Sequence, residues 1–345
     1  MSTPRSLDLP DQVQRVTIHS PRGWFAALDA EPATGVCERR PALFIPGFTG
    51  SKEDFTPVLQ PLALAGRRVV AIDMRGQYQS PAAPRAGGYA PEELAADVAA
   101  VADVIADDHQ GLHLVGHSLG GLIAREAVLA RETRVISLTL LGSGPGRIAG
   151  ERAELLRGML AVMDAAEAKA PADETAEETA DSALADGRLR ITVEQIWDEH
   201  LEPQARQDGV PDPVIGFLHR RMMGNSPTGL MAMGRYLLSC PDRTADLAGI
   251  EGLPIMVLYG EDDDAWPPAA QERMARRLGA HRVCIPGVGH SPAVEAPETT
   301  ASTLTAFWRT AEEEDRRRAG RALSDGHHGR AASPTAGAPH SAATA

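Results

Sequence analysis

Short apolar runs alternate with amphipathic stretches along the first 145 residues. Runs rich in Val, Ile and Leu lie at 42–45, 68–72, 112–115 and 135–141. Each run stops at a Gly, Pro or Asp and is too short for an ordinary helix, so each predicts a buried strand. Between them, Phe55–Ala65 and Glu92–Asp107 carry apolar residues three to four positions apart and predict helices. This alternation predicts an α/β fold with a mostly parallel sheet flanked by helices.

The strand pattern stops after residue 142 and returns near residue 254. Within 143–237, an Ala-, Glu- and Asp-rich part at Ala165–Asp186 leads into helical segments that carry Met and Leu, which predicts an inserted helical cap. Further strands are predicted at 254–259 and 282–285, and further helices at 269–278 and 299–310. The predicted α/β core therefore comprises residues 13–142 and 238–311, interrupted by the cap.

The two ends of the chain differ from this core. Residues 1–12 predict a flexible N-terminus, and residues 312–345 predict a charged extension followed by a disordered tail. Opposite charges four positions apart predict that the extension is an exposed helix; the pairs are Glu312 with Arg316, Glu313 with Arg317 and Glu314 with Arg318. Residues 333–345 contain no aliphatic side chain larger than Ala and predict disorder.

Charge and cysteine content narrow the choice of function. The chain has 34 Lys and Arg against 47 Asp and Glu, a net charge of −13. Since a broad basic patch is missing, nucleic acid and anionic membrane surfaces are disfavoured as partners and a small-molecule substrate is expected. Cys37, Cys240 and Cys284 lack the spacing of a disulfide framework or metal site, which favours a reducing compartment. With neither a secretion signal nor a long apolar span, a cytoplasmic protein is expected.

The sharpest chemical signal is a serine between glycines. Leu112–Val115 leads directly into Gly116-His117-Ser118-Leu119-Gly120, after which a helix is expected. In such a strand-turn-helix context a strained turn lifts the serine hydroxyl clear of the sheet, and Gly116 and Gly120 leave the space that the turn requires. The alternative is a glycine-rich turn with Ser118 as the N-cap of the helix.

A serine nucleophile needs a base, and the base needs an acid to orient it. Glu261-Asp262-Asp263-Asp264 follows the strand predicted at 254–259, and His290 lies on a Gly-rich loop after the strand at 282–285. The order Ser, Asp, His along the chain is that of α/β-hydrolases. The residues alone leave open which of Asp262, Asp263 and Asp264 is the acid.

At this point the chain resembles the α/β-hydrolase superfamily, and within it the cap-bearing branch of serine esterases, carbon–carbon bond hydrolases and haloperoxidase-like enzymes. The resemblance covers about residues 41–308 and rests on four motifs in order. They are Pro46-Gly47-Phe48, Asp73-Met74-Arg75-Gly76, the Ser118 turn, and the paired Asp and His loops.

The resemblance implies a role for particular residues. Asp263 becomes the expected acid, because family members often place it three residues after a strand-ending glycine, here Gly260. The backbone N–H groups of Phe48 and Leu119 become the expected oxyanion donors. Pro46 departs from the common His-Gly form of this turn, so support from a histidine side chain is missing.

The implied activity is hydrolysis of an ester or related acyl bond of a small to medium apolar substrate through an acyl-Ser118 intermediate, with no metal or organic cofactor. Cleavage of a carbon–carbon bond in a diketone, perhydrolysis, and non-catalytic ligand binding are the alternatives. Met-rich helical segments can adapt to apolar groups of different shape. The substrate is therefore expected between the cap and the sheet, near Phe217, Met222, Met223, Met231 and Trp266. His113 and His117 are expected to be structural.

Overall fold

A twisted eight-stranded sheet forms the centre of the molecule, in the order β1-β2-β4-β3-β5-β6-β7-β8. The computed structural model describes residues 2–32, 39–106, 111–168 and 178–328. All neighbouring strands are parallel except β1 with β2 and β2 with β4. The strands are β1 (Val13–Ser20), β2 (Gly23–Ala30), β3 (Ala42–Ile45), β4 (Val69–Ile72), β5 (Leu112–His117), β6 (Val135–Leu141), β7 (Ile255–Gly260) and β8 (His281–Ile285). The predicted, mostly parallel α/β sheet is confirmed.

The six strands from β3 to β8 lie where the sequence predicts them, within one or two residues at each end. The antiparallel hairpin of β1 and β2 was not predicted. In β1 exposed polar residues separate the apolar ones, as expected of a strand at the edge of a sheet. The central strands are buried along their whole length and give a stronger apolar signal.

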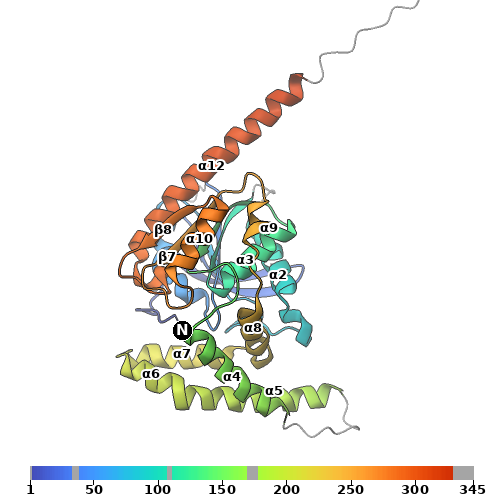
Figure 1. Cartoon of the computed structure of the whole chain (residues 1–345), viewed down its shortest axis with the longest axis vertical. Coiled ribbons are helices and arrows are strands. Elements are labelled where there is room, and N and C mark those ends of the chain that lie inside the picture. The colour runs from blue at the N-terminus through green and yellow to red at the C-terminus, as the bar shows by residue number, and fades with distance from the viewer. Residues whose placement is uncertain (1, 33–38, 107–110, 169–177, 329–345) are drawn as a thin grey trace, which may run out of the picture.

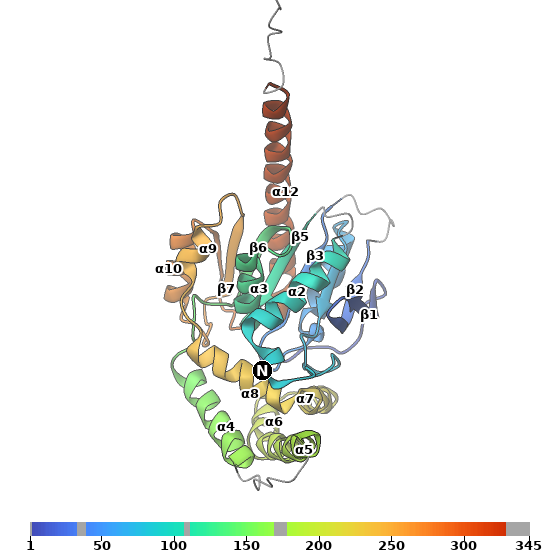
Figure 2. The same ribbon diagram turned by 90° about the vertical axis from the view of Figure 1, so that its right-hand side faces the viewer.

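Helices cover both faces of the sheet, and each face has its own apolar core (Figures 1 and 2). Successive residues of β3 alternate between the two cores: Leu43 and Ile45 belong to one, Ala42 and Phe44 to the other. The first core contains residues of α2 (Pro91–Ile105), α3 (Leu119–Ala130), α9 (Thr244–Ala248) and α10 (Pro268–Leu278). The second contains residues of α1 (Thr56–Leu64), α11 (Pro292–Glu295) and α12 (Pro297–His328). Short helices η1 (Lys52–Phe55) and η2 (Ala86–Tyr89) lie in the connections.

A helical insertion separates β6 from β7. It contains α4 (Glu151–Ala168), α5 (Glu178–Ile196), the π-helical turn η3 (Trp197–Leu201), α6 (Glu202–Gln207), α7 (Asp212–Gly224) and α8 (Pro227–Ser239). Both views place these helices together on one side of the sheet, opposite the protruding part of α12 (Figures 1 and 2). Because the insertion leaves the sheet at the end of β6, it lies on the side of the carboxyl ends of the parallel strands. Its apolar side chains continue the first core.

The last helix joins two predicted segments. The helix predicted at 299–310 and the helical extension predicted after it form one unbroken helix, α12, which continues to His328. Ion pairs link Glu313 to Arg317 and Glu314 to Arg318 as predicted. The Glu312 pair is wrong: Glu312 is buried and binds Arg67 and His113, because its position on α12 faces the sheet. The predicted disorder at 333–345 lies outside the described residues.

Candidate active site

Ser118 lies in a strained turn between β5 and α3. Its φ of 55° and ψ of −121° are outside the usual regions for a residue with a side chain, and such strain is frequent at functional sites. The glycines around it allow the turn to be this tight. A Cβ on Gly116 would lie 2.3 Å from the carbonyl oxygen of Gly120, and one on Gly120 would lie 2.3 Å from that of Ile45. The Ser118 side chain does not cap α3, so the N-cap alternative is not supported.

Three side chains that are far apart in the sequence form one hydrogen-bond chain here. The Ser118 Oγ lies 3.0 Å from His290 Nε2, and His290 Nδ1 lies 2.9 Å from Asp263 Oδ1. The pattern assigns a proton to Nδ1, where the carboxylate accepts it, and leaves Nε2 to accept the Ser118 proton. Ser118 is 8% exposed and His290 is 9% exposed, so these two side chains are largely buried but still accessible to solvent.

Asp263, and neither neighbouring aspartate, reaches His290. Its Oδ1 also accepts the backbone N–H of Ala265 at 2.9 Å, and its Oδ2 accepts the Gln271 amide at 2.8 Å. Burial opposes the charge of Asp263, but the hydrogen bond and charge of His290, together with these donors, lower the pKa of Asp263 below its ordinary value. Asp264 is exposed and pairs with Arg152 at 2.7 Å. The geometry therefore favours Asp263 as the acid.

The loop that carries His290 is fixed by a carboxylate. The two oxygens of Glu295 accept the N–H of Gly289 at 2.6 Å and that of Ser291 at 2.8 Å, one on each side of His290. His117 donates from Nε2 to the His290 carbonyl at 2.9 Å. Burial, with the nearby charge of His290, lowers the pKa of His117 to about 3, which favours the neutral imidazole.

The turn after β3 runs beside the nucleophile. A Cβ on Gly47 would lie 3.0 Å from the Ser118 Cβ and 3.2 Å from His117 Nδ1, so a larger residue at this position would crowd the nucleophile. Within the described part of the chain, neither the Phe48 N–H nor the Leu119 N–H donates a hydrogen bond to a protein acceptor. Two free backbone donors next to a serine hydroxyl are what an oxyanion site requires.

The side chains expected to bind substrate fall into two groups. The Trp266 ring lies 6.1 Å from that of His290, and its indole N–H donates to the Gly146 carbonyl at the start of the insertion. Phe217, Met222 and Met231 are buried in the apolar core that the insertion shares with the sheet. Met223 borders a smaller groove of about 190 Å³ beside Arg190 and Pro227.

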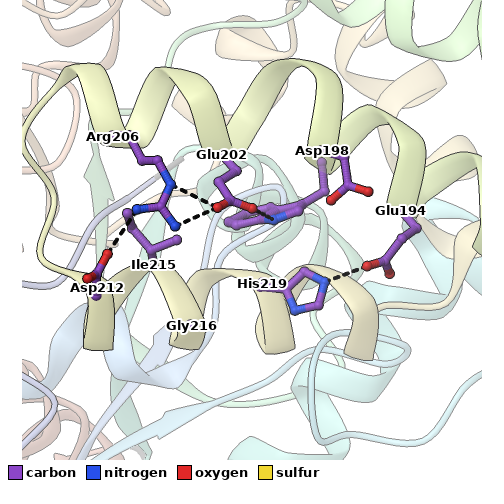
Figure 3. A pocket seen from close by; sticks show the side chains of 9 residues that line it. Glu194, Asp198, Glu202, Arg206, Asp212, Ile215, Gly216 and His219 are labelled. Carbon is purple, nitrogen blue, oxygen red and sulfur yellow. Dashed lines mark hydrogen bonds and ion pairs between the residues drawn. The ribbon is translucent and has the colours of Figure 1, made fainter.

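A larger groove of about 400 Å³ lies within the insertion, between the α5–α6 segment and α7 (Figure 3). The sequence did not predict it. Most of its charged side chains are engaged with one another: Arg206 pairs with Glu202 and Asp212, and His219 binds Glu194 at 2.8 Å. We therefore assign no ligand to this groove.

Sequence reasoning missed three polar residues that bind the loops of this site. They are Gln77, whose amide donates to the Gly47 carbonyl at 2.9 Å, Gln271 and Glu295. Gln271 carried a usable signal, because it lies on the same face of its helix as Met274 and Ala275 and is fully buried with them. Gln77 and Glu295 lie in or beside short loops, where the pattern of the sequence does not reveal the partners of a side chain.

Comparison with known proteins identifies the family. The model of the Alpha/beta hydrolase family matches residues 42–303, so the chain belongs to this family. RutD of Variovorax paradoxus, provisionally named a carbamate hydrolase, is 40% identical over 109 residues, which are 32% of this chain and 40% of that protein. The 2-succinyl-6-hydroxy-2,4-cyclohexadiene-1-carboxylate synthase of Enterobacter sp. is 25% identical over 77% of this chain and 91% of its own length.

A solved structure shows the same fold. A thermophilic esterase from Thermogutta terrifontis aligns with a TM-score of 0.58 and 22% identity, covering 86% of this chain and 99% of its own. Together with the family match, these similarities confirm the predicted superfamily and support a hydrolase enzyme. No helix among the described residues has the length and apolar character needed to span a membrane.

Proposed function

We propose that the protein is a serine hydrolase that cleaves an ester or related acyl bond through an acyl-Ser118 intermediate. The observation that carries the proposal is the unbroken hydrogen-bond chain from Asp263 through His290 to Ser118. It ends at a strained serine on the carboxyl side of the sheet, where open α/β sheets bind their ligands.

In the first half-reaction the Ser118 Oγ attacks the acyl carbon while its proton moves to His290 Nε2. Asp263 stabilises the imidazolium that forms, and its lowered pKa keeps it ionised. His290 then gives the proton to the leaving alcohol as the acyl–oxygen bond breaks. In the second half-reaction water loses its proton to His290 and attacks the acyl carbon, and the proton returns to Ser118 as the acid leaves.

Negative charge develops on the acyl oxygen in both half-reactions. The N–H groups of Phe48 and Leu119 are the proposed donors to this oxyanion, since they flank Ser118 and have no protein acceptor among the described residues. Fixed backbone donors need no reorganisation when the charge appears, and removing one such donor typically slows an enzyme by about 10²- to 10³-fold.

The helical insertion is the proposed cap over this site. Trp266 supports this role, because it packs beside His290 and at the same time binds the beginning of the insertion. Phe217, Met222, Met223 and Met231 are the proposed apolar side of the substrate pocket. Met223→Asp should raise KM for long-chain acyl esters much more than for acetates. An equal effect on both substrate classes would remove Met223 from the pocket.

The test of the proposed function is turnover of a substrate panel. It contains p-nitrophenyl esters of increasing acyl length, a thioester, a carbamate suggested by the RutD similarity, and a diketone. The wild-type protein should hydrolyse the esters, because His290 Nε2 is placed to accept the Ser118 proton. Ser118→Ala should lose at least about 10⁴-fold in kcat.

Other results would contradict the proposal in distinct ways. Cleavage of the diketone without ester hydrolysis would favour carbon–carbon bond cleavage by the same residues. Ester hydrolysis that survives in Ser118→Ala would remove Ser118 as the nucleophile. Ligand binding without any turnover would favour a binding protein.

A further inference from the structure

The peptide between Gly47 and Phe48 is held by a side chain from another loop. The Gln77 amide donates from Nε2 to the Gly47 carbonyl at 2.9 Å. We infer that Gln77 is a positioning residue that orients the Phe48 N–H toward the oxyanion. The inference rests on the proposed function, because it concerns a donor of the same site.

The orientation of the Gln77 amide is determined by its neighbours. Its Oε1 accepts the backbone N–H of Met74 at 3.1 Å, so its nitrogen must face the Gly47 carbonyl. The side chain is 1% exposed, and water cannot easily replace it. The Gly50 N–H also donates to the Gly47 carbonyl, at 3.1 Å. The carbonyl oxygen is thus held by two donors on one side of the peptide.

Holding the carbonyl also fixes the N–H. In a planar trans peptide the C=O and N–H groups point in opposite directions, so a Gly47 carbonyl turned toward Gln77 turns the Phe48 N–H the other way. Gly47 lies against Ser118, which places this peptide at the nucleophile. If the peptide flipped, a carbonyl oxygen would take the place of the donor and would repel the developing oxyanion.

Pro46, which precedes this peptide, cannot supply the support. It has neither an N–H nor a polar side chain, so the side-chain support of this peptide comes from elsewhere in the fold. The Gln77 loop is itself braced by the insertion: the Gly76 carbonyl accepts the Ser226 N–H at 2.7 Å, and the Tyr78 ring packs edge-on against Phe217 at 5.8 Å. Tyr78 has a φ of 38°, a strained value that such bracing can maintain.

The experiment compares Gln77→Met with Gln79→Met. Both remove an amide from the same loop, but Gln79 binds Lys52 and makes no contact with the Gly47 carbonyl. Gln77→Asn is made in parallel, because it keeps an amide that is one methylene too short to reach both Gly47 and Met74, and it serves if Gln77→Met does not fold. Each variant is assayed for p-nitrophenyl ester hydrolysis and for inhibition by an aryl trifluoromethyl ketone, whose adduct with serine carries an oxyanion.

For Gln77→Met and Gln77→Asn we expect kcat to fall by about 10- to 100-fold while KM changes by less than about 3-fold. The inhibition constant of the trifluoromethyl ketone should rise by the same factor as kcat/KM falls, because inhibitor and transition state use the same donor. Gln79→Met should change neither quantity by more than about 3-fold. A role limited to stability would lower the melting temperature and leave kcat and the inhibition constant unchanged.

The outcomes separate this inference from the proposed function. If a fluorophosphonate labels Ser118 in the wild-type protein but the Gln77 variants keep the wild-type kcat and inhibition constant, the inference is wrong and the proposed function stands. Equal losses in the Gln77 and Gln79 variants would also overturn it. If the wild-type protein is not labelled at Ser118, both fail together.

Discussion

The two ends of β5 each carry a serine, a histidine and a carboxylate in one hydrogen-bond chain. Ser118 follows the last residue of β5 and leads through His290 to Asp263. At the other end, His113 lies 2.7 Å from the Ser137 Oγ and 3.1 Å from Glu312 Oε1. Both ends thus contain a serine, a histidine and a carboxylate, but only the Ser118 end has the geometry of a candidate active site.

We call the second group of residues (Ser137, His113 and Glu312) the anchor cluster. It is buried, and the charge of Glu312 is paired with that of Arg67. Ser137 and His113 are fully buried, and Ser137 lies within β6 instead of on a strained turn. Glu312 also pairs with Arg67 at 2.7 Å, and the His113 ring stacks on Trp308 at 5.2 Å. These contacts tie α12 to the sheet. A hydrogen-bonded serine, histidine and carboxylate are therefore not enough to define an active site. Solvent access to the serine and free backbone donors beside it are also required.

The largest difference between the two ends should appear in catalysis. Asp263→Asn should lower kcat by about 10⁴-fold, because the amide no longer stabilises the imidazolium or fixes the His290 tautomer. Steady-state hydrolysis of a p-nitrophenyl ester measures this loss. Glu312→Gln is the matched control at the other end and should keep the wild-type kcat. Similar losses of kcat in Asp263→Asn and Glu312→Gln would contradict the assignment of catalysis to the Ser118 end alone.

The same two variants should differ in stability. Glu312→Gln removes the buried negative charge that pairs with Arg67 and binds His113, so the free energy of unfolding should fall by about 3 kcal/mol. Denaturant unfolding gives this value directly. A loss within error of zero would show that Glu312 does not anchor α12.

Acid should weaken the anchor cluster in two steps. Burial lowers the pKa of His113 to about 4, so between its ordinary value of 6.5 and about 4 only the unfolded chain binds the proton. Burial opposes the charge of Glu312, but the hydrogen bonds from His113 and Arg67 lower its pKa to about 2. The Glu312 contribution is therefore complete above its ordinary value of 4.5 and is lost as the pH falls through about 2.

This dependence is measured as the free energy of unfolding of the wild-type protein and of Glu312→Gln from about pH 7 to about pH 3, because the difference between the two curves cancels the groups that titrate elsewhere in the fold. Below about pH 4.5 the free energy of unfolding should fall less steeply in Glu312→Gln than in the wild-type protein, because the variant has no Glu312 contribution to lose. An identical slope in both proteins would contradict the pKa assigned to Glu312.

Whether the contacts at the two ends of β5 could be predicted from the sequence depends on how far apart the contacting residues lie along the chain. Ser118 and His290 lie in short motifs whose glycines indicate a tight turn, so both residues could be predicted from the sequence. Asp263 needed the family resemblance to separate it from its neighbours. The contact between His113 and Glu312 spans 199 residues and follows no motif, so the pairing of Glu312 with Arg316 was the only one that local spacing could suggest.

The smallest predicted effect is that of the anchor cluster's serine. Ser137→Ala leaves His113 Nδ1 without its hydrogen-bond donor and should lower the free energy of unfolding by about 1 kcal/mol. Hydrolysis should be unchanged, in contrast to Ser118→Ala. If Ser137→Ala reduced kcat to the level of Ser118→Ala, the assignment of the nucleophile would be in doubt.

The most direct test of the central claim is to trap the acyl-enzyme. The wild-type protein is mixed with p-nitrophenyl acetate, quenched with acid within the first turnovers, digested and examined by mass spectrometry. Ser118 should carry one acetyl group, while Ser137 carries none and the Ser118→Ala protein remains unmodified at this site. Rapid release of p-nitrophenol without an acetyl group on Ser118, or with the group on another residue, would contradict the proposed mechanism.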